Sequence, residues 1–166
     1  MGEPGSAALT GATAQSASAK LVCFLLHGQE YGAAIGDVVE TLAVRAVTRV
    51  FLTPPWVAGI MNLRGDVVPV LDLALLLEMP PSLVTDESRI VLVRHQDLRA
   101  GLLVDGLAEL RQVDADRLEA PPATLPPEVT GLLRGIATMA DGAVVRVLDL
   151  PALFESDRVR TLDGLR

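Results

Sequence analysis

The chain repeats itself: three blocks of its first half return, in the same order, in its second half. Residues 67–78 (VVPVLDLALLLE) return as residues 144–155 (VVRVLDLPALFE), at an offset of 77. Residues 54–60 (PPWVAGI) are echoed by residues 126–132 (PPEVTGL), at an offset of 72. A third match, at an offset of 69, pairs Gly32, Ile35, Val38 and Glu40 with Gly101, Val104, Leu107 and Glu109. The period is too long for a solenoid or a propeller blade, and it indicates two copies of one small module.

Short apolar runs, separated every few residues by Gly, Pro or Asp, are typical of many short β-strands. Residues 21–26 and 31–35 flank a polar tetrapeptide and predict a hairpin, and residues 59–63 and 67–71 flank a second turn. Each module has the size of a five-stranded SH3-like barrel. We therefore expect an all-β fold of two such barrel subdomains, with short helices, derived from an internal duplication.

The repeat also sets the expected domain boundaries. We expect a first barrel module at about 20–88 and a second at about 89–158, and the repeat leaves open whether strands are exchanged between them. A barrel of this size is marginally stable alone, which favours the two packing into one body. Residues 1–19, rich in Ala, Gly, Ser and Thr, predict a disordered leader, and residues 159–166 predict a polar tail.

Composition excludes several classes of function. The formal net charge of −7 argues against binding to nucleic acid. No apolar run approaches the roughly 20 residues of a membrane span, so we expect no direct insertion into a membrane. The single cysteine, Cys23, lies in an apolar run and predicts a small buried side chain in a reducing compartment. These features predict a soluble, cytoplasmic protein.

Candidate catalytic and metal-binding groups are sparse. His27 and His95 each lie in a predicted hairpin turn without a second ligand at metal-binding spacing, and no phosphate-binding loop occurs. We therefore expect no metal, no cofactor and no enzymatic activity. Asp72 and Asp149 occupy equivalent strand ends, where a carboxylate usually caps the following helix. The alternative is a small-molecule-binding or hydrolytic double barrel that uses these two aspartates and Asp105, and self-association through exposed barrel edges is a third hypothesis.

One arginine stands out. The segment Asn62-Leu63-Arg64-Gly65 places a guanidinium at a tight turn between two apolar strands. Arg64 is either a solvated turn residue or the partner of a carboxylate such as Glu40, oriented at a groove between the modules. A rigid arginine beside Val, Ile and Leu is typical of protein-binding surfaces.

In these residues the chain resembles the CheW family of adaptors in bacterial chemosensory arrays. The best single match is Gly59-Ile60-Met61-Asn62-Leu63-Arg64-Gly65, which continues into residues 67–73. Tyr31-Gly32 and Val38-Val39-Glu40 fit the first half, and residues 101–105 and 147–150 fit the second. The resemblance covers residues 21–154 and is specific because the blocks occur together and in order.

The resemblance implies a non-enzymatic adaptor that couples the cytoplasmic tip of a chemoreceptor (a methyl-accepting protein) to the regulatory domain of a CheA-type histidine kinase. It implies two SH3-like barrels with a hydrophobic groove between them that receives the receptor's hairpin tip. It implies a cytoplasmic protein recruited to membrane-associated receptor arrays, and we expect a monomer in dilute solution. By position, the residues implied in partner binding are Arg64, Glu40, Asn62, Gly59, Val38 and Val39.

Overall fold

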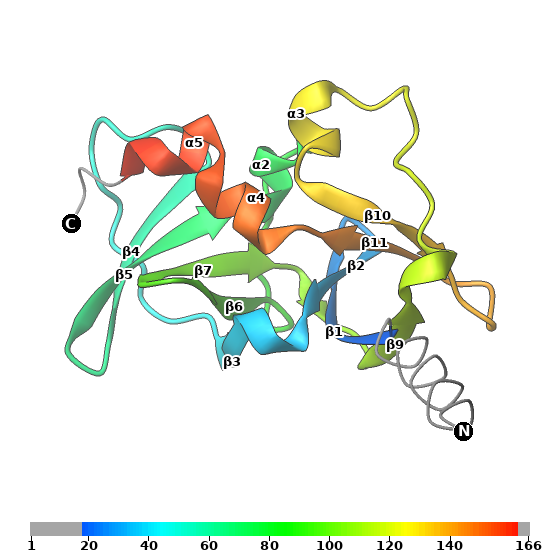
Figure 1. The fold of residues 1–166 in the computed structure, drawn as a ribbon. Helices are drawn as coiled ribbons and strands as arrows, with labels where there is room; N and C mark the ends of the chain where they lie inside the picture. Colours follow the sequence, from blue (N-terminus) through cyan, green and yellow to red (C-terminus); the bar gives the residue numbers. More distant parts are fainter. Residues whose placement is uncertain (1–17, 163–166) are drawn as a thin grey trace, which may run out of the picture.

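The computed structural model describes residues 18–162. The predicted leader therefore lies almost wholly outside the described residues, as do the last four residues of the predicted tail. The strands form two sheets, each of which curls into a small barrel, and the barrels lie side by side (Figure 1). We name them barrel A and barrel B. The prediction of an all-β fold with two barrel subdomains and short helices is confirmed.

Barrel A contains β1 (Ser18–Leu26), β2 (Gln29–Ala34), β8 (Gly106–Leu107), β9 (Arg111–Asp114), β10 (Leu133–Thr138) and β11 (Val144–Leu148). Barrel B contains β3 (Val38–Ala43), β4 (Val57–Leu63), β5 (Asp66–Asp72), β6 (Arg89–His95) and β7 (Leu98–Val104). The helices are α2 (Leu73–Leu76), α3 (Pro127–Thr130), α4 (Leu150–Glu155) and α5 (Asp157–Arg160), with 3₁₀ turns at Ile35–Asp37 and Ala115–Arg117. Because β8 and β9 both pair with β1, they act as two pieces of one edge strand.

The barrels do not coincide with the two sequence repeats. Barrel B is continuous in sequence, from residue 38 to residue 104, whereas barrel A combines residues 18–34 with residues 106–148. The β1–β2 hairpin of the first repeat thus completes the barrel of the second repeat, and the β6–β7 hairpin completes the barrel of the first. The boundary expected between residues 88 and 89 falls inside barrel B, immediately before β6.

Each exchanged hairpin joins its barrel through a parallel strand pair. β2 pairs with β11, where Gly32 faces Val147, and β7 pairs with β5, where Gly101 faces Val70. A Cβ atom on Gly101 would lie 2.6 Å from Ile90 Cγ2, and one on Gly32 would lie 3.0 Å from Leu21 Cδ1. Close packing therefore leaves no room for a side chain at Gly101, whereas one at Gly32 would require Leu21 to shift by a few tenths of an ångström; these are the positions that the sequence repeat matched at an offset of 69.

Three clusters of buried apolar side chains support this arrangement. The interior of barrel A contains Leu21, Cys23, Val113, Ala137, Val145 and Val147, and that of barrel B contains Leu42, Met61, Leu63, Val68, Val70, Ile90, Leu92 and Leu103. The largest cluster lies between the barrels and includes Phe24, Leu26, Tyr31, Leu71, Leu102, Leu148 and Phe154. Because the barrels share this core, they pack as one body, as expected for modules too small to be stable alone.

The helices follow the strands that close each barrel. Asp72 Oδ1 accepts a hydrogen bond from Leu75 N (3.3 Å) before α2, and Asp149 Oδ1 accepts one from Ala152 N (3.0 Å) before α4. The capping role predicted for these aspartates is confirmed. Asp114 stands at the start of a 3₁₀ turn in a similar position, but its side chain makes no capping hydrogen bond.

The end of the described chain differs from the polar tail expected at residues 159–166. Residues Asp157–Arg160 form α5, and Val159 is buried against the core between the barrels. Arg158 Nη2 donates a hydrogen bond to the carbonyl oxygen of Leu76 (2.9 Å), which joins α5 to α2. One buried valine in a polar run gives too weak a periodic signal to predict a helix from sequence.

The alignment of the two repeats requires one correction. The register of β4 against β5 shifts between Val57 and Gly59, and that of β10 against β11 shifts between Leu133 and Gly135. Gly59 is therefore equivalent to Gly135, at an offset of 76 rather than 72, and the four-residue helix α3 accounts for the difference. Residues 133–135 (Leu-Arg-Gly) resemble Leu63-Arg64-Gly65 but are not equivalent to them, because the turn of the β10–β11 hairpin lies at residues 141–142.

Candidate functional site

Arg64 and Glu40 form an ion pair on the surface of barrel B. Arg64 Nη1 donates to Glu40 Oε2 at 2.6 Å, and Arg64 Nη2 donates to Glu40 Oε1 at 3.0 Å. The two parallel hydrogen bonds make the pair bidentate, a geometry that fixes the plane of the guanidinium. The Arg64 side chain is 67% exposed and that of Glu40 is 27% exposed, so the pair stays open to solvent. Hydrogen bonding between them lowers the pKa of Glu40 and raises the pKa of Arg64.

The turn between β4 and β5 holds Arg64 in place. Arg64 and Gly65 have positive φ angles of 52° and 90°, as in the tight two-residue turns that connect twisted β-strands. A non-glycine residue in this conformation is strained by roughly 1–2 kcal/mol. Asn62 Oδ1 accepts a hydrogen bond from Gly65 N (3.1 Å) and so bonds the backbone of the turn. Asn62 thereby supports the conformation that presents Arg64.

Gly59 supports the same hairpin from its other side. Its φ of 152° is rare for residues with a side chain, and a Cβ atom would lie 2.3 Å from the carbonyl oxygen of Thr48. Thr48 and Ile60 form an isolated antiparallel bridge, with hydrogen bonds of 2.8 and 2.9 Å in the two directions. Gly59 therefore lets the segment before β4 lie directly against the strand that leads to Arg64.

The two valines next to Glu40 have different surroundings. A β-bulge in β3 between Val38 and Glu40 leaves Val39 without a partner on β6, and its side chain is 43% exposed. Val38 is half-buried and packs against the core between the barrels. The exposed apolar neighbour of the ion pair is thus Val39, whereas Val38 contributes to packing. The part of these residues in partner binding stays a prediction.

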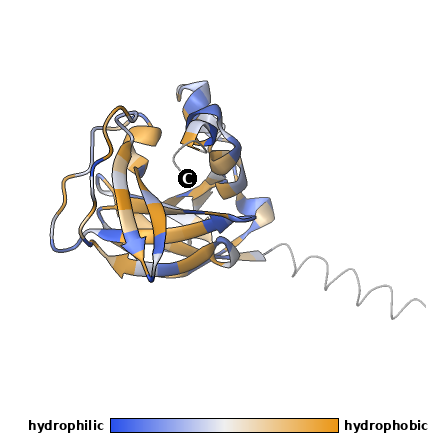
Figure 2. Ribbon diagram, turned by 90° about the vertical axis from the view of Figure 1, so that its left-hand side faces the viewer, coloured by the Kyte–Doolittle hydropathy of each residue, from blue (hydrophilic) through white to orange (hydrophobic). Residues whose placement is uncertain are grey.

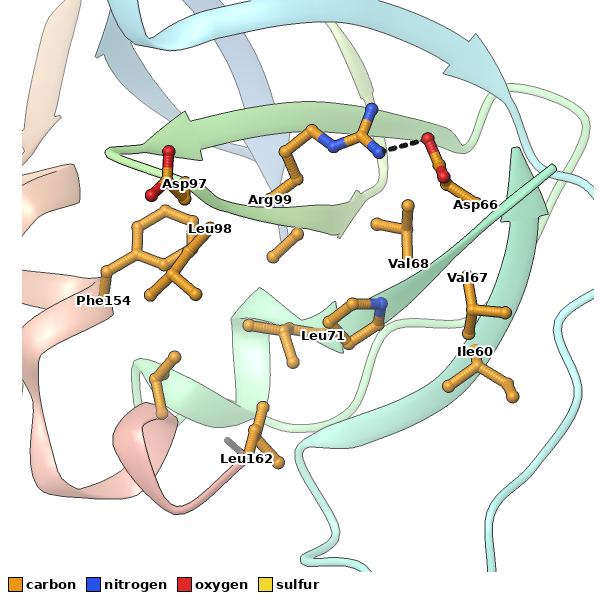
Figure 3. A pocket seen from close by; sticks show the side chains of 13 residues that line it. Ile60, Asp66, Val67, Val68, Leu71, Asp97, Leu98, Arg99, Phe154 and Leu162 are labelled. Carbon is orange, nitrogen blue, oxygen red and sulfur yellow. Dashed lines mark hydrogen bonds and ion pairs between the residues drawn. The ribbon is translucent and has the colours of Figure 1, made fainter. Parts of the chain in front are cut away.

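An apolar groove lies elsewhere on barrel B, between the outer faces of β5 and β7 and the α4–α5 segment (Figure 3). Its volume is about 490 Å³. Apolar side chains line most of it: Ile60, Val67, Val68, Pro69, Leu71, Leu98, Ala100, Phe154, Val159 and Leu162. Asp66, Asp97 and Arg99 supply its charged side chains, and Arg99 Nη2 donates to Asp66 Oδ2 at 2.8 Å.

The resemblance implied a hydrophobic groove between the barrels but not the lining of this one, and the six residues expected in partner binding do not line it. The expectation that Arg64 points into a groove between the modules therefore does not apply to this groove. A signal was present in the repeat, because Ala100 stands at the position that matches Tyr31 at an offset of 69. A small residue in one copy where the other has a large one indicates space at that place.

The aspartates of the alternative hypothesis are engaged with the backbone. Asp72 Oδ2 accepts from Ser82 N (3.1 Å) in addition to its capping bond, and Asp105 Oδ2 accepts from His27 N (2.7 Å). Asp72, Asp105 and Asp149 do not line the groove. Within residues 18–162, no three His, Cys, Asp or Glu side chains are grouped as a metal site would require. Short polar residues that bond nearby backbone groups in this way are structural.

Cys23, His27 and His95 are packed or bonded as structural residues. Cys23 is buried, and burial raises the pKa of its thiol to about 12, so it packs as a small apolar residue, as predicted. His27 is exposed in its hairpin turn, and its Nε2 lies 2.7 Å from the carbonyl oxygen of Pro80. His95 ends β6 beside its predicted hairpin turn, but its side chain is only 18% exposed and stacks on Phe154 with ring centroids 5.8 Å apart. In the described part of the chain, no helix is long and apolar enough to cross a membrane.

Comparisons with known proteins agree with this architecture. A family model described as a CheW-like domain matches residues 20–158. A chemotaxis protein CheW from Bacillus subtilis is 27% identical over 138 residues, which cover 83% of this chain and 88% of that protein. A chemotaxis protein CheW from Helicobacter pylori is 29% identical and covers 83% and 82%. The crystal structure of the scaffolding protein TtCheW from Thermoanaerobacter tengcongensis superposes with a TM-score of 0.73 at 33% identity, over 84% of this chain and 89% of that one.

Proposed function

The chain belongs to the CheW-like family of chemotaxis scaffolding proteins, and from this premise we propose that it couples chemoreceptors to a CheA-type histidine kinase. It acts by binding alone: one surface engages the cytoplasmic signalling tip of a receptor, and another engages the regulatory domain of the kinase. It works in the cytoplasm, recruited to membrane-associated arrays, and is a monomer in dilute solution. The match over residues 20–158 supports the family role, and the Arg64–Glu40 pair supports a partner surface on barrel B.

The exposed ion pair carries this proposal. A bidentate pair with a fixed plane, on a turn supported by Asn62 and beside the exposed Val39, is a rigid polar and apolar patch. Such a patch binds a protein without the cost of ordering a flexible side chain. Exposed surface ion pairs contribute little to the stability of a fold. The rigid geometry of this pair is therefore better explained by binding to a partner than by a structural role.

The test measures binding of the full chain to a receptor cytoplasmic fragment and to a CheA-type kinase from the same genome. We expect Arg64→Ala to weaken binding to one of them by about tenfold, as for a central interface arginine. Arg134→Ala is the matched control, because Arg134 is an exposed arginine on a strand of barrel A. It should bind both partners as wild type does.

Reconstituted kinase control gives the functional readout. Addition of the wild-type chain should place kinase activity under receptor control, and the Arg64→Ala chain should do so less effectively at equal concentration. If wild type binds neither partner and leaves receptor control of the kinase unchanged, the adaptor function is wrong. If Arg64→Ala binds and couples as well as Arg134→Ala does, the ion pair lies outside both interfaces.

A further inference from the structure

The groove between barrel B and the α4–α5 segment is apolar at its base and charged at its edge. Pro69 of β5 and Leu98 and Ala100 of β7 line it, together with Phe154 of α4 and Val159 of α5. Figure 3 shows Leu98 next to Phe154. The base continues the core between the barrels, to which Leu71 and Phe154 belong. At one end lies Val67, whose side chain is 62% exposed. Val67 is exposed and Ile60, Pro69 and Leu98 are half-buried, so the groove presents apolar side chains to solvent above the buried Leu71, Ala100 and Phe154.

The equivalent place on barrel A is filled. Tyr31 stands where barrel B has Ala100, and Arg146 stands where barrel B has Pro69. Tyr31 is 5% exposed, and the guanidinium carbon of Arg146 lies 5.7 Å from the centroid of its ring. The Tyr31 hydroxyl lies 3.8 Å from Met79 Sδ, in the segment that follows α2. The fold can therefore close this site with its own side chains, and in barrel B the residues that would close it are replaced by alanine and proline.

The charges at the groove select the chemistry of an occupant. Arg99 is paired with Asp66, whereas Asp97 is exposed and makes no salt bridge within residues 18–162. The whole chain carries a formal charge of −7, which favours a basic partner at long range. Asp66 and Val67, at the start of β5, are exposed, so the groove is open to solvent along this strand. A small-molecule site, by contrast, typically buries most of its ligand.

We propose that this groove is a second protein-docking site, which takes a short amphipathic segment of a partner protein. Apolar side chains of the segment occupy the space over Ala100 and Leu98, and a lysine or arginine next to them pairs with Asp97. Laying the apolar face of a segment into a groove and pairing its polar edge at the rim is a common mode of peptide recognition. The site is separate from the Arg64–Glu40 surface and does not depend on the adaptor function.

The test uses a displayed library of random 16-residue peptides, selected against the full chain and depleted on a groove-filled variant. Ala100→Tyr places in barrel B the side chain that fills barrel A. Ala100 is only 2% exposed, so a tyrosine at this position puts the fold at risk. The double variant Leu98→Gln/Pro69→Arg is therefore a second way to block the groove, and it also copies the matching residues of barrel A. Circular dichroism and thermal unfolding establish that each variant is folded before it is used.

We expect enriched peptides to contain apolar residues with at least one Lys or Arg, and to lose at least tenfold in affinity for a folded groove variant. Asp97→Asn should weaken them by about two- to fivefold, as for a charge pair at an exposed rim. Val67→Ser should weaken binding, and Val144→Ser, at the matching exposed position of barrel A, should not. Arg64→Ala should leave their affinity unchanged.

Three results would overturn the proposal. The first is a failure to enrich any peptide over the depleted variants, and the second is enrichment of peptides that bind wild type and folded groove variants equally. The third is saturable binding of an apolar dye such as anilinonaphthalene sulfonate that both blocks abolish, in the absence of peptide binding, which would make the groove a small-molecule site. Because receptor and kinase are absent from the assay, these outcomes are separate from failure of the adaptor function.

Discussion

Each barrel contains one bidentate arginine–glutamate pair, and the two pairs differ in their access to solvent. In barrel A, Arg111 Nε donates to Glu30 Oε2 at 2.5 Å and Arg111 Nη2 donates to Oε1 at 3.2 Å, and both side chains are only 14% exposed. In barrel B, the Arg64 side chain is 67% exposed. The same chemical pair therefore joins β9 to β2 inside one barrel and lies open on the surface of the other.

The hairpin turns show the same contrast. The β10–β11 turn of barrel A presents Asp141, which accepts a hydrogen bond from Arg111 Nη1 at 3.3 Å. At the matching position, 77 residues earlier, the turn of barrel B presents Arg64. Together with the filled place around Tyr31 and the groove at Ala100, this difference indicates that barrel A is closed by its own side chains. At these two places, barrel B leaves charged and apolar groups accessible where barrel A covers the matching groups with its own side chains.

The strongest test of this contrast removes each arginine in turn. Arg111→Met would leave Glu30 and Asp141 without their cation. We expect the free energy of unfolding to fall by about 2 kcal/mol, a value between those for exposed and for buried ion pairs. Arg64→Met should leave the thermal midpoint within error of wild type, because its pair is exposed. Thermal and denaturant unfolding of both variants provide the measurement. Equal losses of stability would contradict the assignment of one pair to the fold and the other to the surface.

A smaller effect separates the two capping aspartates. Asp72 is buried and accepts from both Leu75 N and Ser82 N, whereas Asp149 accepts from Ala152 N at its helix. We expect Asp72→Ala to cost about 2 kcal/mol and Asp149→Ala about 1 kcal/mol, the upper and middle values for loss of an N-cap. Chemical denaturation measures both. A loss of binding to a small molecule, with stability unchanged, would instead favour the alternative hypothesis of a ligand-binding double barrel.

The smallest effect concerns the titration of Glu40. Its pKa in the folded chain is lowered by hydrogen bonds from Arg64, so the contribution of the pair is complete above the unfolded pKa and is lost as the pH falls through the lowered folded value. In Arg64→Ala, we expect the pKa of Glu40 to return towards its ordinary value. Carboxyl chemical shifts in a pH titration by NMR measure this change. An unchanged pKa would show that the bidentate pair does not persist in solution.

Local features of the fold followed from the sequence because their causes are local. The hairpin turn at His27-Gly28, the aspartate caps and the tight turn at Arg64-Gly65 depend on residues within a few positions of each other. The pairing of Arg64 with Glu40 was one of two interpretations that the residues left open and the one that the resemblance favoured, and the structure contains it. Its role in binding has no such local cause and stays a proposal.

Features that depend on distant segments could not be predicted. The parallel pairing of β2 with β11 joins residues more than a hundred positions apart, and no periodicity within either strand encodes it. The helix α3 displaced the second repeat by four residues, which made Gly131 rather than Gly135 look like the counterpart of Gly59. The burial of Val159 and the stacking of His95 on Phe154 likewise depend on how α4 and α5 return to the barrels.

The exchanged hairpins set an order of events on the ribosome. All strands of barrel B have been synthesised once residue 104 has emerged, so this barrel can close while the rest of the chain is still being translated. The β1–β2 hairpin is made before the other strands of barrel A, yet its parallel partner β11 ends only at residue 148. β1 pairs with β2 at once and with β8 and β9 by residue 114, so only the outer edge of β2 waits for β11, and until then the nascent protein exposes this edge of the sheet.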